Sequence, residues 1–173
     1  YKDDYDMHSM DFEEFLWAKG YSAEQIESLY VNMISIKPFT QLELETMMGV
    51  FRDYMTIGGM PEVVKKYIAS GNFSGTLGLQ RQLLRDYEED ITKYAKNAEK
   101  AKILAVYKHI STFLAKENKK FQISKVARNA RSRDYIGCVE WLKEAGVINI
   151  AYCLGNAELP LKGNYDAYYY KLY

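Results

Sequence analysis

The sequence predicts a mainly α-helical chain, in which a bundle of helices is followed by a winged helix made of three helices and a β-hairpin. Three observations support this prediction. Apolar residues recur at helical spacing from residue 9 to residue 116, between the serine, threonine, glycine and proline residues that commonly begin and end helices. A further helical pattern follows a basic segment, and the stretch 147–173 combines two β-rich runs with a loop that contains glycine and proline.

Size and composition narrow the class of protein. The chain has 173 residues with 48% hydrophobic and 27% charged content, enough to fold alone, and no run of about 18 residues lacks charge. The chain has only two cysteines, Cys138 and Cys153, which is too few for a disulfide framework or a four-thiolate zinc site. We expect reduced thiols, a cytoplasmic location without membrane contact, and, because the chain begins at Tyr1 without a leader, an interior piece or a processed chain.

Three helices are predicted before residue 58. The first follows Ser9 and ends before Gly20. Two capping-box spacings predict the starts of the next two helices: Ser22 with Gln25, and Thr40 with Glu43. The second helix carries an apolar stripe at helical spacing up to Pro38, and this stripe consists of Ile26, Leu29, Tyr30, Met33 and Ile34.

A glycine pair precedes the fourth predicted helix, which begins at Pro61 and ends at Gly71. Gly58 and Gly59 could form an anion cradle at this helix start, but a plain interhelical turn is the favoured alternative. A long helix from about 76 to 97 follows. For its acidic cluster, residues 86–90, we favour surface ion pairs over a metal site, because adjacent acids on a helix point in different directions.

The remainder predicts the winged helix. A helix spans 99–116, a short strand covers Lys120–Ile123, and Ser124 caps a second helix over Lys125–Arg131. Ser132 caps a third helix that stops at Gly146. The runs 147–154 and 165–173 then form a hairpin around the long loop 155–164.

The net charge is zero, from 23 basic and 23 acidic residues, but the charge is unevenly placed. Residues 1–50 carry 3 basic against 10 acidic residues, and residues 101–173 carry 12 against 6. Most of the excess is basic residues between 116 and 133: Lys116, Lys119, Lys120, Lys125, Arg128, Arg131 and Arg133. Such a run can bind phosphates or can serve only as a solvated surface, and the sequence leaves both open.

In a winged helix the third helix enters the major groove of DNA. Beyond Arg133, this helix offers few side chains that could contact base edges, so we expect binding to phosphates with poor sequence specificity. The residues assigned to nucleic-acid binding are Lys119, Lys120, Lys125, Arg128, Arg131 and Arg133. Because winged helices also act as rigid protein-contact modules, a protein partner is the alternative.

Five short motifs occur in order along the chain: DFEEFL (11–16), GGMPEVV (58–64), YEEDITKY (87–94), KENKKF (116–121) and WLKEAGVI (141–148). Together they resemble the middle of the prokaryotic AAA-type P-loop ATPases that carry a C-terminal domain of unknown function. The resemblance implies a helical lid-like region over 1–75, a connecting long helix over 76–98 and a winged-helix domain over 99–173.

The resemblance also implies a parent protein that binds ATP and Mg²⁺, whereas this chain contains no G-x-x-x-x-G-K-[ST] string. We therefore expect no catalytic residue, metal ligand or cofactor in the chain itself, and no ATP hydrolysis by it. Gly58, Gly59 and Lys65 would belong to the nucleotide lid, although Lys65 stands where such lids often carry a sensing arginine.

Two functions follow from the resemblance. In the first, the chain couples the nucleotide state of the parent ATPase to contact with DNA or protein through the basic segment. In the second, it is a scaffold that holds the ATPase core against the parent's C-terminal region, a protein partner or another subunit. Its 16 tyrosines favour the second function, because tyrosine is enriched at protein interfaces.

Overall fold

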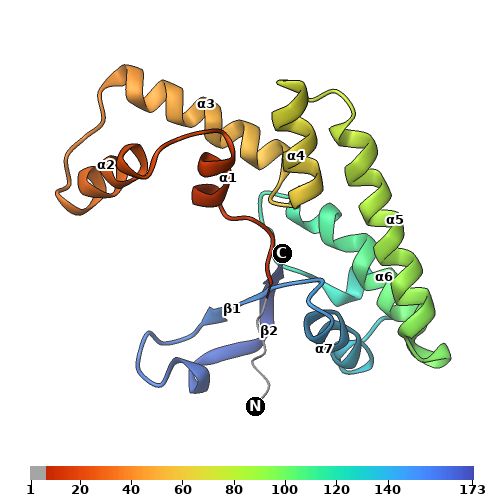
Figure 1. Ribbon diagram of the computed structural model, residues 1–173. Coiled ribbons are helices and arrows are strands. Elements are labelled where there is room, and N and C mark those ends of the chain that lie inside the picture. Colours follow the sequence, from red (N-terminus) through yellow and green to blue (C-terminus); the bar gives the residue numbers. More distant parts are fainter. Residues whose placement is uncertain (1–6) are drawn as a thin grey trace, which may run out of the picture. The chain divides into compact units, whose positions relative to one another are not determined.

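The computed structural model describes residues 7–173 and divides the chain into two compact units, Tyr1–Leu84 and Arg85–Tyr173. Within the described residues the chain is mainly helical, with seven α-helices and one antiparallel sheet of two strands (Figure 1). The division falls inside the long helix α5 (Thr76–Tyr94), whose two halves pack on different cores. None of the described helices combines the length and the apolar character needed to cross a bilayer.

The first unit holds four complete helices: α1 (Phe12–Ala18), α2 (Ala23–Ile34), α3 (Gln41–Ile57) and α4 (Pro61–Ser70). Its core is formed by eight buried side chains, namely Phe15, Leu16, Ile26, Val50, Ile57, Val63, Val64 and Tyr67. Leu79 and Leu83 of α5 pack against this core. Burial of these side chains supplies the main driving force for the fold of this unit.

The helix starts follow local chemistry. The capping boxes predicted for α2 and α3 are both formed, because each hydroxyl accepts from the backbone three residues on and the Gln25 or Glu43 side chain accepts in return. The start of α1 differs from the prediction. Its N-cap is Asp11, not Ser9, and Asp11 forms a reciprocal pair with Glu14 that satisfies two backbone amides.

The predicted apolar stripe of α2 faces the core only in part. Ile26 is buried and Leu29 is half-buried, but Tyr30, Met33 and Ile34 are exposed. The helix is therefore formed as predicted, but only the first part of its apolar stripe is buried.

The turn between α3 and α4 is fixed by close backbone contact. Gly59 accepts a hydrogen bond of 2.7 Å from the amide of Met10, and a Cβ at Gly59 would lie 2.0 Å from the carbonyl oxygen of Met10. Pro61 occupies the first position of α4 and Gly71 ends it with a left-handed conformation, as predicted.

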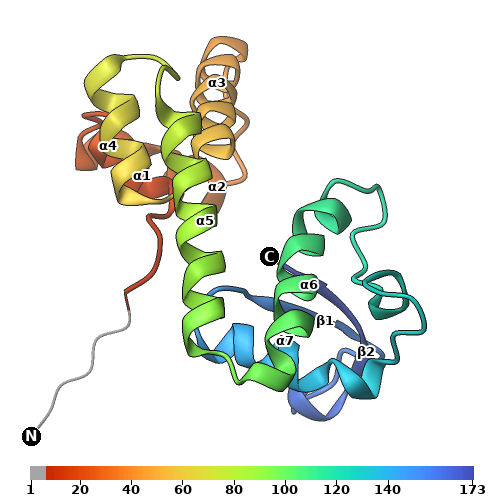
Figure 2. The same cartoon turned by 90° about the vertical axis from the view of Figure 1, so that its right-hand side faces the viewer.

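The second unit contains the end of α5, together with α6 (Asn97–Leu114), α7 (Ile136–Glu144), β1 (Ile150–Leu154) and β2 (Tyr165–Leu172) (Figure 2). Both α7 and β2 contact α6. The side chains of Ile103, Leu142 and Leu172 are almost completely buried where these elements meet. The predicted hairpin is thus present, and it is packed on the helices of its own unit.

Two elements predicted for this unit are absent. Residues 120–123 form no strand, although the amide of Phe121 donates one hydrogen bond of 2.9 Å to the carbonyl of Tyr170 in β2. Residues 125–131 form no α-helix. A single 3-10 turn, Ile123–Lys125, is followed by Asn129 with a φ of 62°, a left-handed conformation that stops helix growth and that asparagine tolerates.

The start of α7 also differs from the prediction. Ser132 does not cap it, because residues Ser132–Asp134 form a separate 3-10 turn and α7 begins at Ile136. Ser124 likewise lies within a 3-10 turn and caps no helix. The helix that was expected to follow Ser132 directly is therefore shorter, and Arg133 precedes it.

The pairing of the two strands is irregular, and this irregularity was not predicted from the sequence. Tyr152 pairs with Tyr170, whereas its neighbour Cys153 pairs with Asp166, so residues 167–169 of β2 bulge out of the ladder. The carboxylate of Asp166 accepts the amide of Tyr168 at 2.7 Å, which stabilises the bulge. Tyr168 and Tyr169 consequently project from the strand instead of following its alternation.

The turn between α3 and α4 gives a direct test of the first unit. Gly59→Ala should lower the free energy of unfolding by about 2 kcal/mol, because the new methyl group meets backbone that cannot move aside freely. Gly78→Ala is the matched control. It lies in α5 with open space around its Cα and should raise stability by about 0.5–1 kcal/mol. Urea denaturation measures both changes, and equal effects would contradict the packing described.

Candidate nucleic-acid interface

The basic segment (residues 116–133) connects α6 to the turn before α7. It lacks an α-helix of its own, yet four apolar side chains hold the connection between α6 and α7 to the core of the second unit, namely Phe121, Ile123, Val126 and Tyr135. The ring of Phe121 packs against the ring of Phe113 in α6, with the two ring centres 4.8 Å apart. The segment is therefore anchored in its middle by three of these side chains and just beyond its end by Tyr135.

The charged groups point away from those anchors. Lys119, Lys125, Arg128 and Arg131 are exposed, as are Lys116 and Arg133, and Lys120 is half-buried. Among residues 7–173, Arg133 is the member of the segment that pairs with a carboxylate, at 3.8 Å between its Nε and Oδ1 of Asp134. All six residues predicted to bind nucleic acid thus lie on one connection, with their charges largely unneutralised by the chain itself.

Two of the lysines lie over aromatic rings. The Nζ of Lys120 is 3.7 Å from the ring centre of Tyr169, and the Nζ of Lys116 is 4.2 Å from that of Phe113. A cation held over a ring keeps its charge while losing some freedom of movement. The Lys120–Tyr169 contact therefore ties the basic segment to the bulge of β2.

A hollow of about 360 Å³ lies where the basic segment meets β2. Its lining includes polar groups from Lys120, Gln122, Ser124 and Ser132, together with the ring of Tyr168. Lysine and hydroxyl donors can bind phosphate oxygens, and an exposed aromatic ring can stack on a base. The hollow can therefore accept a phosphate with an attached base at the edge of the cationic surface.

The helix α7 offers little for reading a base sequence. Its exposed N-terminal side chain is Ile136, and Glu140 on the following turn is half-buried and acidic. A carboxylate near phosphates opposes binding, and an isoleucine contacts only apolar groups. Base-specific contact by α7 therefore has little support in its exposed side chains, and binding through the nucleic-acid backbone stays a prediction.

The residues assigned to the nucleotide lid lie in the first unit, at the turn between α3 and α4. The amide of Gly58 donates to the carbonyl of Tyr54 at 2.8 Å, and the carbonyl of Gly59 accepts from the amide of Met10. Lys65 is exposed on α4. Of these three residues, Lys65 supplies a cation, and none has a side chain that binds Mg²⁺. Their role in a nucleotide lid stays a prediction.

The bulge at 167–169 and the hollow beside it were missed by sequence reasoning. The signal that could have found them is Asp166 two residues before Tyr168, a spacing at which an aspartate accepts the backbone amide and forms an Asx turn. Within the described residues, no group of three or more histidine, cysteine, aspartate or glutamate side chains is placed to hold a metal ion.

The fold and this surface define a mainly helical protein with a small antiparallel sheet and an exposed basic connection between two of its helices. The family described as Domain of unknown function (DUF8612) matches residues 48–173, which is well over half of the chain, and the chain belongs to that family. No curated protein and no solved structure matches it. The matched residues include the basic segment and the hairpin.

The half-buried Tyr170 predicts a loss of stability in alkali. Burial raises the pKa of Tyr170 to about 12. Below about pH 10 the folded and unfolded chains both keep the proton, whereas between about pH 10 and pH 12 only the folded chain does, so stability falls as the pH rises. Tyr170→Phe should make this loss shallower in denaturation curves recorded at about pH 9 and pH 11.

Tyr168→Phe makes the same change at an exposed tyrosine of the same strand and is the matched control. An alkaline loss in Tyr170→Phe as steep as in the unmodified chain would show that Tyr170 is not buried as described. Burial likewise raises the pKa of Tyr107 to about 12, so part of the loss should persist in the variant.

Proposed function

We propose that this chain is the lid and winged-helix portion of an AAA-type ATPase and that it contacts DNA through the basic segment. The observation that carries the proposal is the exposure of the cations between 116 and 133 beside a polar, aromatic hollow. Phosphate groups are the ligands that such a surface suits best, because exposed lysines and arginines release condensed counterions when they bind them. Sequence preference is expected to be weak.

The order of elements in the second unit supports a winged helix. A helix, a connection, a second helix and a hairpin follow one another, and the hydrogen bond from Phe121 to Tyr170 lies where a third strand would join the sheet. The middle helix of the motif is replaced by the 3-10 turn at Ile123–Lys125. A compact turn in place of a helix still directs the following arginines outward, as the exposure of Arg128 and Arg131 requires.

Coupling between nucleotide and DNA would run through α5. Its side chains Leu79 and Leu83 pack on the core of the first unit, whereas Ile91 belongs to the core of the second. A continuous helix that contributes to two cores can transmit a displacement from one to the other. In this proposal ATP and Mg²⁺ are bound by the parent protein, and the chain supplies the lid and the DNA contact.

A scaffold role is the second candidate, and one observation favours it. Four tyrosines at the C-terminal end of the chain expose large parts of their rings, namely Tyr165, Tyr168, Tyr169 and Tyr173. Exposed tyrosines are typical of protein interfaces. In that case the hairpin would hold the ATPase core, the parent's C-terminal region or another subunit, and DNA affinity would be absent.

The proposal predicts a salt-dependent affinity for duplex DNA. Fluorescence anisotropy with a labelled duplex of about 20 base pairs should show binding at low salt, with the logarithm of the affinity falling by about 0.9 per neutralised phosphate for each unit of log salt. The triple variant Arg128→Glu, Arg131→Glu, Arg133→Glu should bind more weakly and reduce the slope by about three, without a new sequence preference.

A variant with the same net charge keeps this test specific. Lys37→Glu, Lys66→Glu and Arg81→Glu reverse three exposed cations of the first unit and should leave the slope unchanged. An equal loss in both variants would show that total charge alone governs binding. Absence of binding at low salt in the unmodified chain would remove the DNA contact and favour the scaffold.

A further inference from the structure

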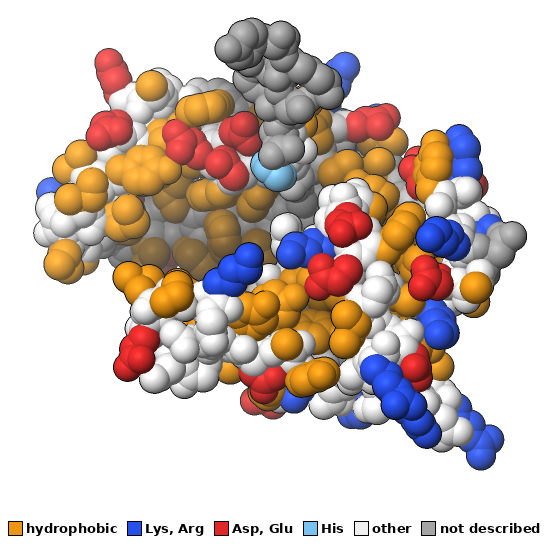
Figure 3. Space-filling model, turned by 90° about the horizontal axis from the view of Figure 1, so that it is seen from below, with side chains coloured by type: hydrophobic (Ala, Val, Ile, Leu, Met, Phe, Trp, Pro, Cys, Tyr) orange, Lys and Arg blue, Asp and Glu red, His pale blue; other side chains and the backbone are white. Residues whose placement is uncertain are grey.

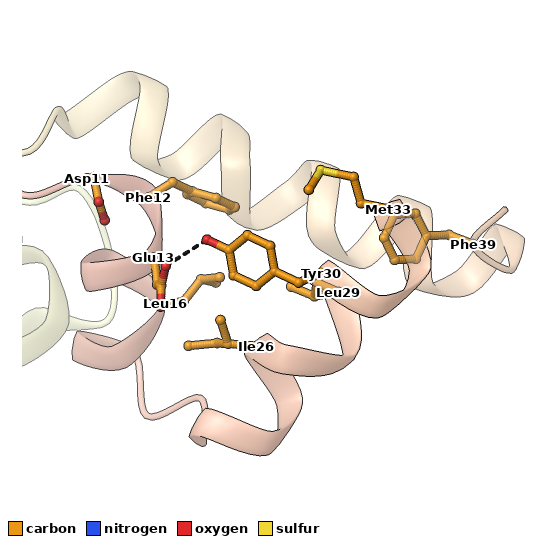
Figure 4. A pocket seen from close by; sticks show the side chains of 9 residues that line it. All are labelled: Asp11, Phe12, Glu13, Leu16, Ile26, Leu29, Tyr30, Met33 and Phe39. Atoms are coloured by element: carbon orange, nitrogen blue, oxygen red, sulfur yellow. Dashed lines mark hydrogen bonds between the residues drawn. The ribbon is translucent and has the colours of Figure 1, made fainter. Parts of the chain in front are cut away.

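A groove opens in the first unit between α1, α2 and Phe39, which lies in the connection between α2 and α3 (Figure 4). Its volume is about 460 Å³, and its lining is largely apolar and aromatic, with Phe12, Leu16, Tyr30, Met33 and Phe39 among the contributors. The sticks in Figure 4 show Tyr30 reaching from α2 toward α1 and Phe39 at the far end. Among residues 7–173, no lysine or arginine lines it.

One edge of the groove is acidic. The hydroxyl of Tyr30 donates to Oε2 of Glu13 at 2.7 Å, which fixes this carboxylate beside the apolar lining, and Asp11 lies on the same edge. A carboxylate has more than one acceptor site, so Glu13 can accept from a further donor while it holds Tyr30. A partner that fills the groove would therefore gain from carrying a cation near Glu13.

The apolar surface continues from the groove onto α3. The rings of Phe12 and Phe51 meet edge to face with centres 5.2 Å apart. Phe51 belongs to a stripe of exposed side chains on α3 at spacings of four, three and four residues, made of Leu44, Met48, Phe51 and Met55. This is the spacing of a coiled-coil seam, and such a seam packs against another helix.

The other face of α3 is already occupied, since Val50 and Ile57 lie in the core of the unit. A helix that is apolar on two faces is normally covered on both. On α2, Met33 is 65% exposed, and Ile36 just beyond its end is 90% exposed. The exposed apolar side chains thus extend well past the groove, farther than one small molecule would cover.

Charge indicates what kind of partner fits. Residues 7–50 carry seven acids, Asp11, Glu13, Glu14, Glu24, Glu27, Glu43 and Glu45, against the two lysines Lys19 and Lys37. Figure 3 shows hydrophobic side chains with acidic ones among them over the part of the chain that holds α1 to α3. A second copy docked through this surface would bring acids against acids, whereas a basic partner would be attracted.

We propose that the groove and the α3 stripe bind an amphipathic helix of a partner protein, whose apolar face fills the groove and whose polar face carries lysine or arginine. This binding site lies in the first unit and goes beyond the DNA contact, which lies in the second. The apolar anchors supply affinity, and the acids around the groove set the preferred charge of the partner.

A synthetic peptide provides the test. The probe is a helical peptide of about 20 residues with leucine at the heptad core positions and lysine elsewhere, and the comparison peptide carries glutamate in place of lysine. Isothermal titration calorimetry with the full chain should detect binding of the lysine peptide only. Met33→Lys, which fills the groove mouth and repels the peptide, should weaken binding by at least about tenfold.

Two further variants separate shape from charge. Glu13→Gln keeps the size of the side chain but removes its charge, and it should weaken binding a few fold while reducing the dependence on salt. Leu77→Lys introduces the same lysine at an exposed leucine of α5 and should leave the affinity unchanged.

Three results would overturn the proposal. The first is equal binding of the glutamate peptide, and the second is an affinity unaffected by Met33→Lys. The third is self-association of the chain in sedimentation experiments that Met33→Lys abolishes, which would assign the surface to a second copy. The proposed DNA contact is tested with duplex DNA and with substitutions in the basic segment of the second unit, so its failure and the failure of this proposal are distinguishable.

Discussion

The geometry of the basic segment depends on its anchoring to the core. Phe121 and Val126 are buried, and the amide of Phe121 is bonded to the carbonyl of Tyr170 in β2. Between these points the chain forms no α-helix and no strand, so without them the cations would be distributed over a flexible loop. Anchoring holds the backbone on either side of Lys125 to the core, while Lys125 and the arginines that follow it stay exposed to water.

Local chemistry made much of the fold predictable. The capping boxes that begin at Ser22 and Thr40, the proline at the start of α4 and Gly71 at its end all act within a few residues, so the sequence alone contains the whole interaction. The hairpin was predictable for the same reason, from two β-rich runs around a loop of turn residues. The exposure of the basic residues followed from their charge.

Features that depend on distant contacts were not predictable. The approach of Met10 to Gly59 joins residues far apart in sequence, and the left-handed conformation of Asn129 replaced a helix that local propensity allowed. The bulge at Tyr168 and Tyr169 arises from strand register, which the sequence pattern does not fix. The groove was not predictable either, because the apolar periodicity of α2 indicates a face of the helix and not what covers that face.

The two units carry net charges of opposite sign, and these charges cancel in the chain as a whole. Amide spectra of the ¹⁵N-labelled chain, recorded during titration with duplex DNA at low salt, test the central claim most directly. The account predicts chemical-shift changes concentrated in residues 116–135 and 166–170, with the amides of residues 7–75 unaffected. Changes confined to the first unit, or none in the basic segment, would contradict it.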